Sequence, residues 1–453
     1  MLVVLSDLHF SEAQSTKVGD LQFNKNLPAD NYRAYFLELN QIAVSNRIRH
    51  VDMVLAGDIF ELSRSGLWFE SDERPYRSNA SVAEGSAMET TILKILQAIA
   101  HEERVRDALT LFKNVRELFN VEVQVHYLPG NHDRLINATS QTRAAARDLL
   151  GLAGGGELFA HRFIYSGEFG QPFCLVRHGH EYDPMNFSLD THLLEEIPTD
   201  FSEEVYGAVS LGDVTTVEFG AALPYYFMQS YGAEAIQRDP ILLALYERLM
   251  AFDDVRPTSA LLPYLFSTPG VKKKKTWVYM EPCFKQVIRV ISKTPEFVEA
   301  ITSIESLPKS QRILLKGLLN SNLMQQGVPY WMVKQLMKRV SSEIKLSSQV
   351  KWAKREALVK DKSSGCQCVI SGHTHVPEVS LMSAKKGNER YYINTGTWRN
   401  VIPATKNFQE FGRLKSLAKV IVFGPVENEN ATNEMPWSFH FLSGVNYGNH
   451  RHL

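Results

Sequence analysis

Acidic, amide and imidazole side chains follow five short apolar stretches of the sequence. These stretches are LVVLSD (2–7), VDMVLAGD (51–58), VEVQVHYLPGNHD (121–133), FCLVRHGH (173–180) and CQCVISGHTH (366–375). The side chains near their ends that could bind a metal ion are Asp7, His9, Asp58, Asn131, His132, Asp133, His178, His180, His373 and His375. Carboxylate, amide oxygen and imidazole together suit Mn²⁺, Fe or Zn²⁺ better than Ca²⁺ or Mg²⁺. Thiolates are absent from the set, which argues against a structural zinc site.

The positions of these side chains favour one shared site. Any single cluster could be an ordinary polar turn. Near-continuous apolar runs of this length, however, are typical of strands that are covered on both faces in α/β folds. Ligands of open α/β sheets bind beyond the carboxyl ends of the strands. Five clusters that all follow their strands therefore predict a single binding site.

Helical patterns separate the predicted strands and fill one long interval. They cover about 32–46 and about 87–119, which gives the strand and helix alternation of an α/β fold. The interval 184–362 is mostly helical in pattern, as in DPILLALYERLMAF and PYWMVKQLMKRVSSEIKL. Three later stretches, YYINTGTW, AKVIVFG and WSFHFLS, predict closing strands. The sequence therefore predicts a core in two parts, 1–183 and 363–453, and an inserted helical cap, 184–362.

Composition bounds the class of protein. The chain has 453 residues, of which 44% are hydrophobic and 22% are charged, as in a globular protein with a sizeable core. No apolar stretch approaches the ~18 residues of a membrane span, and the first residues lack the basic region of a secretion signal. Four cysteines in a chain this long do not form a disulfide framework. We expect a cytoplasmic, reducing compartment.

The charge is unevenly distributed. Residues 184–271 contain 13 acidic and 3 basic side chains, whereas residues 272–362 contain 7 acidic and 19 basic ones. Such a division can indicate an anionic partner. The uneven charge is explained equally well if the two segments face each other and their opposite charges compensate.

The motifs as a set resemble those of the calcineurin-like metallophosphoesterase family. They are Asp7-x-His9, Gly57-Asp58, Gly130-Asn131-His132-Asp133, His178-Gly179 and Gly372-His373-Thr374-His375. They follow the order of the family, and only the interval before the last motif is unusually long. The resemblance implies a four-layer αββα fold, in which a β-sandwich flanked by helices holds two divalent metal ions. Mn²⁺ is the first candidate, and Fe or Zn²⁺ are the others.

The resemblance also implies a role for each motif residue. The first metal would be held by Asp7, His9 and His375. The second would be held by Asn131, His178 and His373, with Asp58 bridging the two. The family pattern favours His178 over His180 as the ligand from the HGH motif.

The implied reaction is the hydrolysis of a phosphoester. A hydroxide that bridges the metals would be the nucleophile, and His132 would give a proton to the leaving group. Asp133 would orient His132 through a hydrogen bond.

Three substrate classes remain open. The first is a small phosphoester or nucleotide, enclosed by the cap and the loop after Asp58. Arg64, Trp68, Arg74 and Arg77 of that loop could contact the substrate, but an exposed polar loop explains each of them equally well. The second is a nucleic acid, cleaved as by the DNA-repair exonucleases of the family. The basic stretch 309–362, with Tyr330, Trp331 and Trp352, could bind it, although a solvated helix face with buried tryptophans is the favoured explanation of that stretch.

The third is a lipid-linked pyrophosphate, because SDLHF and GDIFE followed by a tryptophan resemble the UDP-diacylglucosamine pyrophosphohydrolases. Those enzymes typically carry Arg at the place of His132 and lack so long an insertion. A scaffold of the same fold without activity is a further alternative, although scaffolds typically lose ligands that this chain retains. The oligomeric state does not follow from the sequence.

Overall fold

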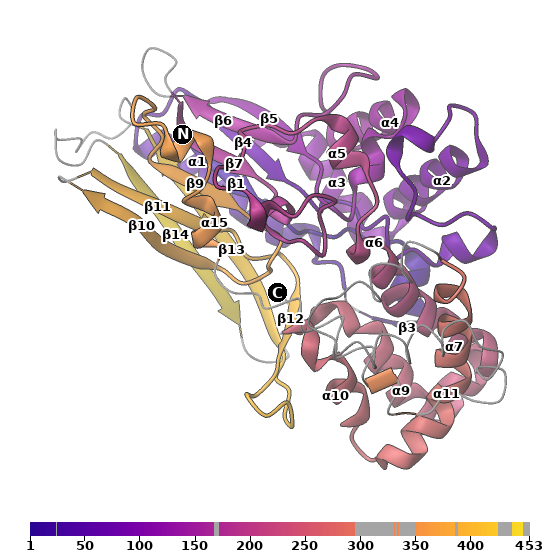
Figure 1. Cartoon of the computed structure of the whole chain (residues 1–453). Coiled ribbons are helices and arrows are strands. Elements are labelled where there is room, and N and C mark those ends of the chain that lie inside the picture. The colour runs from indigo at the N-terminus through magenta and orange to yellow at the C-terminus, as the bar shows by residue number, and fades with distance from the viewer. Residues whose placement is uncertain are drawn as a thin grey trace.

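The computed structural model describes residues 1–23, 25–166, 172–294, 330, 333–334, 349–385, 388–424 and 437–446. In this part of the chain, two large sheets and the helices around them form a mixed α/β protein (Figure 1). The α/β class predicted from the sequence is therefore confirmed.

Seven strands form the first sheet, in the order β5-β4-β1-β13-β12-β8, with β14 paired to β13. Their bounds are β1 Leu2–Leu5, β4 His50–Ala56, β5 Glu122–Leu128, β8 Val255–Arg256, β12 Asn400–Pro403, β13 Leu414–Phe423 and β14 Ser438–Asn446. β1, β4 and β5 run parallel, whereas β13 is antiparallel to β1. The carboxyl ends of β1, β4 and β5 therefore lie at the same edge of the sheet.

Five strands form the second sheet, in the order β10-β11-β9-β7-β6. Their bounds are β6 Arg162–Ser166, β7 Pro172–Arg177, β9 Cys368–Ser371, β10 Glu378–Lys385 and β11 Asn388–Asn394. β7 and β9 run parallel, with Val176 opposite Ile370, so these two strands also end together. A separate short pair consists of β2 Lys17–Val18 and β3 Leu21–Gln22.

The two sheets share a buried core because side chains alternate along each strand. Leu2 and Val4 of β1 face this core together with Val176 of β7. Val3 and Leu5 of β1 point the other way and pack with helices. Both faces of β1 are covered, which explains why its four residues are all apolar.

Helices cover the outer faces of both sheets. Four pack on the first sheet: α1 Ala29–Ser45, α2 Ala87–His101, α3 Glu103–Lys113 and α4 Ser140–Leu150. Two short ones pack on the second sheet: α15 Val350–Ala353 and α16 Ala357–Lys360. Among the described residues, 3-10 helices cover Ala13–Ser15, Gly66–Glu70, Asn79–Ser81, Val115–Leu118, Arg134–Asn137, His180–Tyr182, Thr191–Leu193, Phe252–Asp254 and Thr258–Ala260.

One predicted helix is wrong in its extent. The pattern over 87–119 predicts a single helical segment, but α2 and α3 are separate and meet at Glu102. Glu102 has an extended backbone, and its side chain accepts a hydrogen bond from the backbone N–H of Val105. A side chain that caps a new helix in this way stabilises the break between the two.

A group of helices lies between β7 and β9 in the sequence and joins the first sheet through β8. Its helices, as far as the structure describes this interval, are α5 Glu203–Gly207, α6 Leu211–Thr215, a π-helical turn over Thr216–Ala221, α7 Ala222–Tyr231, α8 Ala233–Arg238, α9 Pro240–Met250, α10 Leu261–Phe266 and α11 Lys273–Ile291. The helices from α6 to α11 surround a hydrophobic core of their own, which Ile402 of β12 reaches where β12 pairs with β8. In Figure 1, α7, α9, α10 and α11 lie at the lower right, below the two sheets, whereas α5 lies higher, at the level of α3.

Several other sequence predictions can be compared with these elements. The helix expected in DPILLALYERLMAF is confirmed by α9, which begins at Pro240 after its cap, Asp239. The three closing strands are confirmed by β11, β13 and β14. The helix expected in PYWMVKQLMKRVSSEIKL lies almost wholly outside the described residues. The domain limits at 183 and 362 stay a prediction.

None of the helices in the described part of the chain combines the length and the apolar character that crossing a membrane requires.

Candidate metal centre

The predicted metal-binding side chains meet where five strands end. They follow β1, β4 and β5 of the first sheet and β7 and β9 of the second. Three groups of side chains place their ligand atoms within 4.8 Å of one another: Asp7 with His9 and His375, Asp58 with His178 and His373, and His9 with Glu61 and His132. Most of these side chains are buried, and each group could hold a metal ion.

The first group joins β1 to the loop after β9. Nε2 of His375 lies 3.0 Å from Nε2 of His9 and 3.2 Å from Oδ1 of Asp7. Two imidazole nitrogens and a carboxylate oxygen that converge in this way suit a cation between them.

The second group joins β4 and β5 to the second sheet. Nε2 of His178 lies 3.2 Å from Oδ2 of Asp58 and 3.2 Å from Oδ1 of Asn131. The rings of His178 and His373 are 5.3 Å apart. Oδ2 of Asp58 is also 3.6 Å from Nε2 of His9, so this carboxylate touches both groups.

Glu61 links the third group and was not predicted as a site residue. Its Oε1 lies 2.8 Å from Nδ1 of His132, and its Oε2 lies 2.8 Å from Nδ1 of His9. The prediction that Asp133 orients His132 through a hydrogen bond is therefore wrong, because Glu61 occupies Nδ1 of that ring. Adjacent residues of a loop need not point the same way, and Asp133 points elsewhere.

Asp133 instead holds two loops together. Its carboxylate accepts hydrogen bonds from the backbone N–H groups of Gly130 (2.5 Å), Ile59 (2.8 Å), Asp58 (3.3 Å) and Phe60 (3.3 Å). These donors belong to the loops after β4 and β5. Asp133 therefore fixes the backbone that carries Asp58 and His132.

The backbone at the cluster adopts a conformation that side chains disfavour. Five of the predicted metal ligands have a positive φ: Asp7 (55°), His9 (46°), Asp58 (54°), His373 (71°) and His375 (59°). Among the other described non-glycine residues, only Arg47 and Phe408 share this property. Strain of this kind persists where the surrounding structure imposes it, and it gathers at functional sites.

Two motif glycines leave room for the ligands. A Cβ on Gly372 would lie 2.2 Å from Oδ2 of Asp7, and one on Gly130 would lie 2.3 Å from Oδ1 of Asp58. Both distances are far shorter than a carbon and an oxygen can approach. The glycines before the histidine of GHTH and before the asparagine of GNHD therefore allow the loops to close on the two carboxylates.

Burial controls the charges of the first group. It raises the pKa of Asp7 to about 6, and the nearby Asp58 adds to this rise. It lowers the pKa of His9 to about 3, so this imidazole is neutral at pH 7. A neutral imidazole is the form that binds metals, and a nearby cation favours the ionised form of a carboxyl group.

The HGH motif divides its two histidines between different environments. His178 belongs to the second group, whereas His180 belongs to none of the three groups. His180 packs against Phe187 and Tyr206, and burial lowers its pKa to about 3. The structure thus brings His178, rather than His180, next to Asp58.

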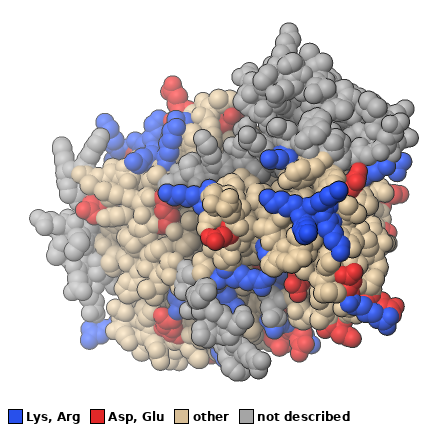
Figure 2. Space-filling model, turned by 90° about the horizontal axis from the view of Figure 1, so that it is seen from below, with Lys and Arg blue, Asp and Glu red and all other residues tan. Residues whose placement is uncertain are grey.

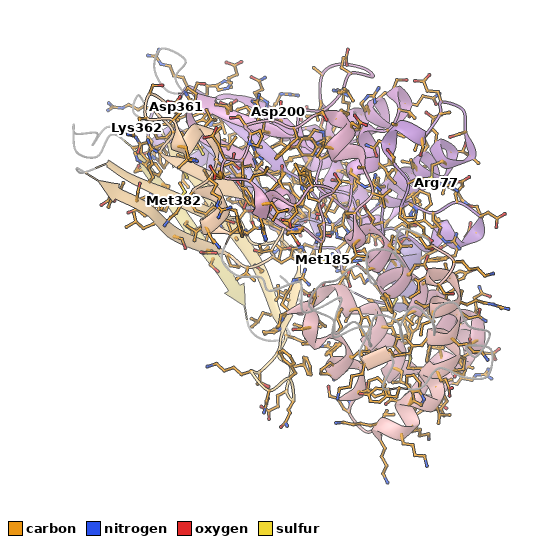
Figure 3. All side chains as sticks on the ribbon, viewed as in Figure 1. Arg77, Met185, Asp200, Asp361, Lys362 and Met382 are labelled. Carbon is orange, nitrogen blue, oxygen red and sulfur yellow. The ribbon has the colours of Figure 1, made fainter. Side chains whose placement is uncertain are left out.

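A cavity of about 140 Å³ opens beside the cluster. Beyond the cluster residues, its lining includes Arg64, Met185, Asn186, Gly220, Arg256 and Thr258. Most of this wall comes from the chain between β7 and β9. Figure 3 labels Met185 at this position, near the centre of the molecule.

A second cavity, of about 330 Å³, adjoins the first. Both are lined by Arg64, Gly220 and Asp253. The rest of its wall includes Lys17, Lys25, Tyr225, Met228, Tyr246 and Leu249. Aromatic, apolar and charged side chains surround this second space, which has Arg64, Gly220 and Asp253 in common with the cavity beside the cluster.

Of the four residues predicted to contact a substrate, only Arg64 lines the first cavity. Trp68 is fully buried and donates from Nε1 to the carbonyl of Leu62. Arg74 donates to backbone carbonyls, including that of Trp68. Arg77 is exposed and pairs with Glu73, and Figure 3 shows it far from Met185. These three residues stabilise the loop after β4, and none of them lines either cavity, so the structure gives the predicted contact no support for them.

Sequence reasoning also missed Arg256. Nη2 of Arg256 lies 2.6 Å from Nδ1 of His375, although the two residues are 119 positions apart. No spacing in the sequence relates them. Glu61, in contrast, is only three positions after Asp58 in GDIFE. Its closeness in the sequence to a predicted ligand could have indicated it as a site residue.

Comparisons of the chain with models of known protein families and with curated protein sequences found no match.

We expect Asp133→Asn to destabilise the protein. The amide would place a donor where two oxygens now accept four backbone N–H groups, and lost hydrogen bonds to a charged group cost about 1.5–3 kcal/mol each. Urea denaturation should show a free energy of unfolding lower by at least about 2 kcal/mol.

The matched control is Asp148→Asn, in which the same chemical change removes an exposed pair with Lys113. It should cost less than about 0.5 kcal/mol. Equal stabilities of the two variants would contradict the role of Asp133 in holding the loops.

Proposed function

We propose that this protein is a metal-dependent phosphoester hydrolase of the calcineurin-like type, with a four-layer αββα core. The observation that carries the proposal is the convergence of side chains from five strand ends into one buried cluster beside a cavity. Polar turns without a shared function would not be expected to converge from two different sheets.

The proposed cofactors are two divalent metal ions, with Mn²⁺ preferred and Fe or Zn²⁺ as alternatives. One ion would be held by Asp7, His9 and His375, and the other by Asn131, His178 and His373. Asp58 is suited to serve both, since it touches both groups. When bound, two such ions polarise phosphoryl oxygens and lower the pKa of a water molecule between them. The oxygen and nitrogen donors of the cluster fit this choice of metals.

His132 is the proposed proton donor to the leaving group. Its ring lines the cavity, and Glu61 holds Nδ1, which leaves Nε2 to act on a leaving oxygen. Burial acts to lower the pKa of His132, but the negative charges of Glu61 and Asp58 outweigh this effect and raise it. A raised pKa keeps the imidazole protonated at higher pH, as a general acid requires.

The proposed substrate is a small phosphoester or a nucleotide. The first cavity would hold the phosphoryl group beside Arg64, and the adjoining cavity offers space for the organic part. The tyrosine rings and basic side chains of the adjoining cavity suit a ring-shaped, anionic molecule.

The described residues give less support to a nucleic-acid substrate. Most of the basic stretch 309–362, with Trp331, lies outside them. The Trp352 ring stacks on His192 at 3.6 Å, and Tyr330 packs on Phe266 and Trp277. Figure 2 shows Lys and Arg in separate groups, with Asp and Glu between them, on the face at the α9 and α11 end. A lipid-linked pyrophosphate and a scaffold role stay as alternatives, and no specific observation favours either.

The experiment that tests this proposal begins with metal-free protein, to which Mn²⁺ is returned. The panel is p-nitrophenyl phosphate, bis-p-nitrophenyl phosphate, cyclic nucleotides, single-stranded DNA and a UDP-sugar lipid. We expect hydrolysis of a small phosphoester that a chelator abolishes. Folded, metal-loaded protein that hydrolyses none of the panel would contradict the proposal.

His132→Ala should separate chemistry from metal binding. We expect the hydrolysis rate to fall by ~10²–10⁴-fold while metal analysis finds the content of the parent protein. p-Nitrophenolate leaves without a proton, so p-nitrophenyl esters should lose less activity than alkyl esters.

The matched control is His126→Ala, since His126 also pairs with a carboxylate at 2.8 Å, that of Asp52, but belongs to none of the three groups. It should leave the rate within about twofold, as surface changes away from a site usually do. If both ester classes slow equally in His132→Ala, the ring acts on the phosphate or the metals instead.

Gly220→Leu should place a bulky side chain where the two cavities adjoin, because Gly220 lines both of them. The nearest atoms to a Cβ at this position belong to the Arg64 side chain, at 3.5 Å or more, so the backbone tolerates a side chain. We expect kcat/KM for the largest substrate of the panel to fall by about tenfold or more. p-Nitrophenyl phosphate should be affected much less.

The small control is Gly220→Ala, which should resemble the parent protein on both substrates. If Gly220→Leu slows small and large substrates equally, the second cavity does not receive the organic group.

A further inference from the structure

Arg256 reaches the metal-binding cluster from an unexpected direction. It is the last residue of β8, at the edge of the first sheet, and it lines the first cavity. Its Nη2 lies 2.6 Å from Nδ1 of His375. The chain between β7 and β9 thus contacts a predicted metal ligand directly.

This contact determines where His375 carries its proton. A guanidinium has donors only, so Nδ1 of His375 must accept. A neutral ring then has its proton on Nε2, the nitrogen that points to His9 and Asp7. A metal in the first group would need the lone pair of that same Nε2. The arginine contact and the metal therefore compete for His375.

Arg256 has no carboxylate partner among the residues that the structure describes. Its Nη1 donates to the backbone carbonyls of Asp253 (2.8 Å) and Val255 (2.9 Å). Its neighbours Arg64 and Arg399, in contrast, both pair with the carboxylate of Asp253, at 3.0 and 2.6 Å.

The charge of Arg256 persists at neutral pH. Burial and the charges of Arg64 and Arg399 lower its pKa, but only to about 10. The charges of Asp254 and Asp253 act in the opposite direction and raise it. A partly buried cation that makes no direct ion pair is suited to bind an anion.

Thr258 also lines the first cavity. Its Oγ1 is buried and has no hydrogen-bond partner among the described residues, so it would reach an anion only if the side chain turned toward the cavity. The guanidinium of Arg256 at the cavity wall is suited to phosphate oxygens.

We propose that Arg256 is a phosphate-binding residue controlled by metal occupancy. While Nδ1 of His375 accepts from it, as in the structure, Arg256 is held by that ring. A metal bound at Asp7, His9 and His375 breaks this contact, because Nδ1 must then carry the proton, and Arg256 turns into the cavity toward the substrate phosphate. This inference rests on the proposed function, since it requires that the first group binds a metal.

The mechanism makes metal and phosphate binding cooperative. Metal binding releases the residue that binds phosphate, so phosphate must tighten the binding of the metal by the same factor. The protein would bind its substrate poorly until it is loaded with metal.

The test measures Mn²⁺ and inorganic phosphate binding by titration calorimetry in the parent protein, Arg256→Gln and Arg64→Gln. Arg256→Gln removes the competitor for His375, so we expect it to bind Mn²⁺ about fivefold more tightly in the absence of phosphate. Phosphate should bind Mn²⁺-loaded Arg256→Gln about tenfold or more weakly than it binds the loaded parent protein.

Arg64→Gln is the matched control, because Arg64 lines the same cavity but pairs with Asp253 and Glu61. It should weaken phosphate binding without the gain in Mn²⁺ affinity. Arg256→Lys keeps the charge and replaces Arg256→Gln if circular dichroism shows that the latter is unfolded; it too should gain Mn²⁺ affinity, because its single ammonium cannot reproduce the guanidinium contact.

Three results would overturn the inference. Unchanged or weaker Mn²⁺ binding in folded Arg256→Gln contradicts the competition. Stronger Mn²⁺ binding with unchanged phosphate affinity contradicts the phosphate role. A parent protein that binds no Mn²⁺ contradicts the metal centre itself, and that result identifies the proposed function, rather than Arg256, as the error.

Discussion

The burial of two carboxylates among imidazoles is the constraint on which the rest of the structure depends. Asp7 and Asp58 are both at most 1% exposed, and each is close to ring nitrogens of buried histidines. Charges removed from water are costly unless an opposite charge or a metal compensates them. A cation between these side chains would turn this unfavourable burial into a binding site. Loop backbones with positive φ and glycines without a Cβ serve to keep the side chains together.

The cluster belongs to no single element of the fold. The first sheet supplies Asp7, Asp58 and Asn131, and the second supplies His178 and the histidines of GHTH. The core between the sheets must therefore be packed before the side chains can meet. The chain between β7 and β9 contributes most of the cavity wall, including Arg256, so the cluster and the wall beside it come largely from different parts of the sequence.

Features that depend on local sequence pattern could be predicted from the sequence. Contacts between residues that are distant in the sequence were missed. Apolar runs and motif order were enough to predict the strands and the residues at their ends. The break at Glu102 escaped because the apolar periodicity continues across it. Asp133 was assigned to His132 because the two are adjacent, whereas Glu61 reaches that ring only through the approach of two loops. Trp68 was considered as a substrate contact, but its side chain is buried within its own loop. The contact of Arg256 with His375 could be identified only in the folded structure.

The central claim is that the strand ends form a centre for two metals. Crystals grown with Mn²⁺, with anomalous diffraction measured at the manganese absorption edge, test it most directly. We predict two peaks ~3.5–4 Å apart, one among Asp7, His9 and His375 and the other among Asn131, His178 and His373, with Asp58 between them. Well-ordered crystals in which no manganese lies among these side chains would contradict the account.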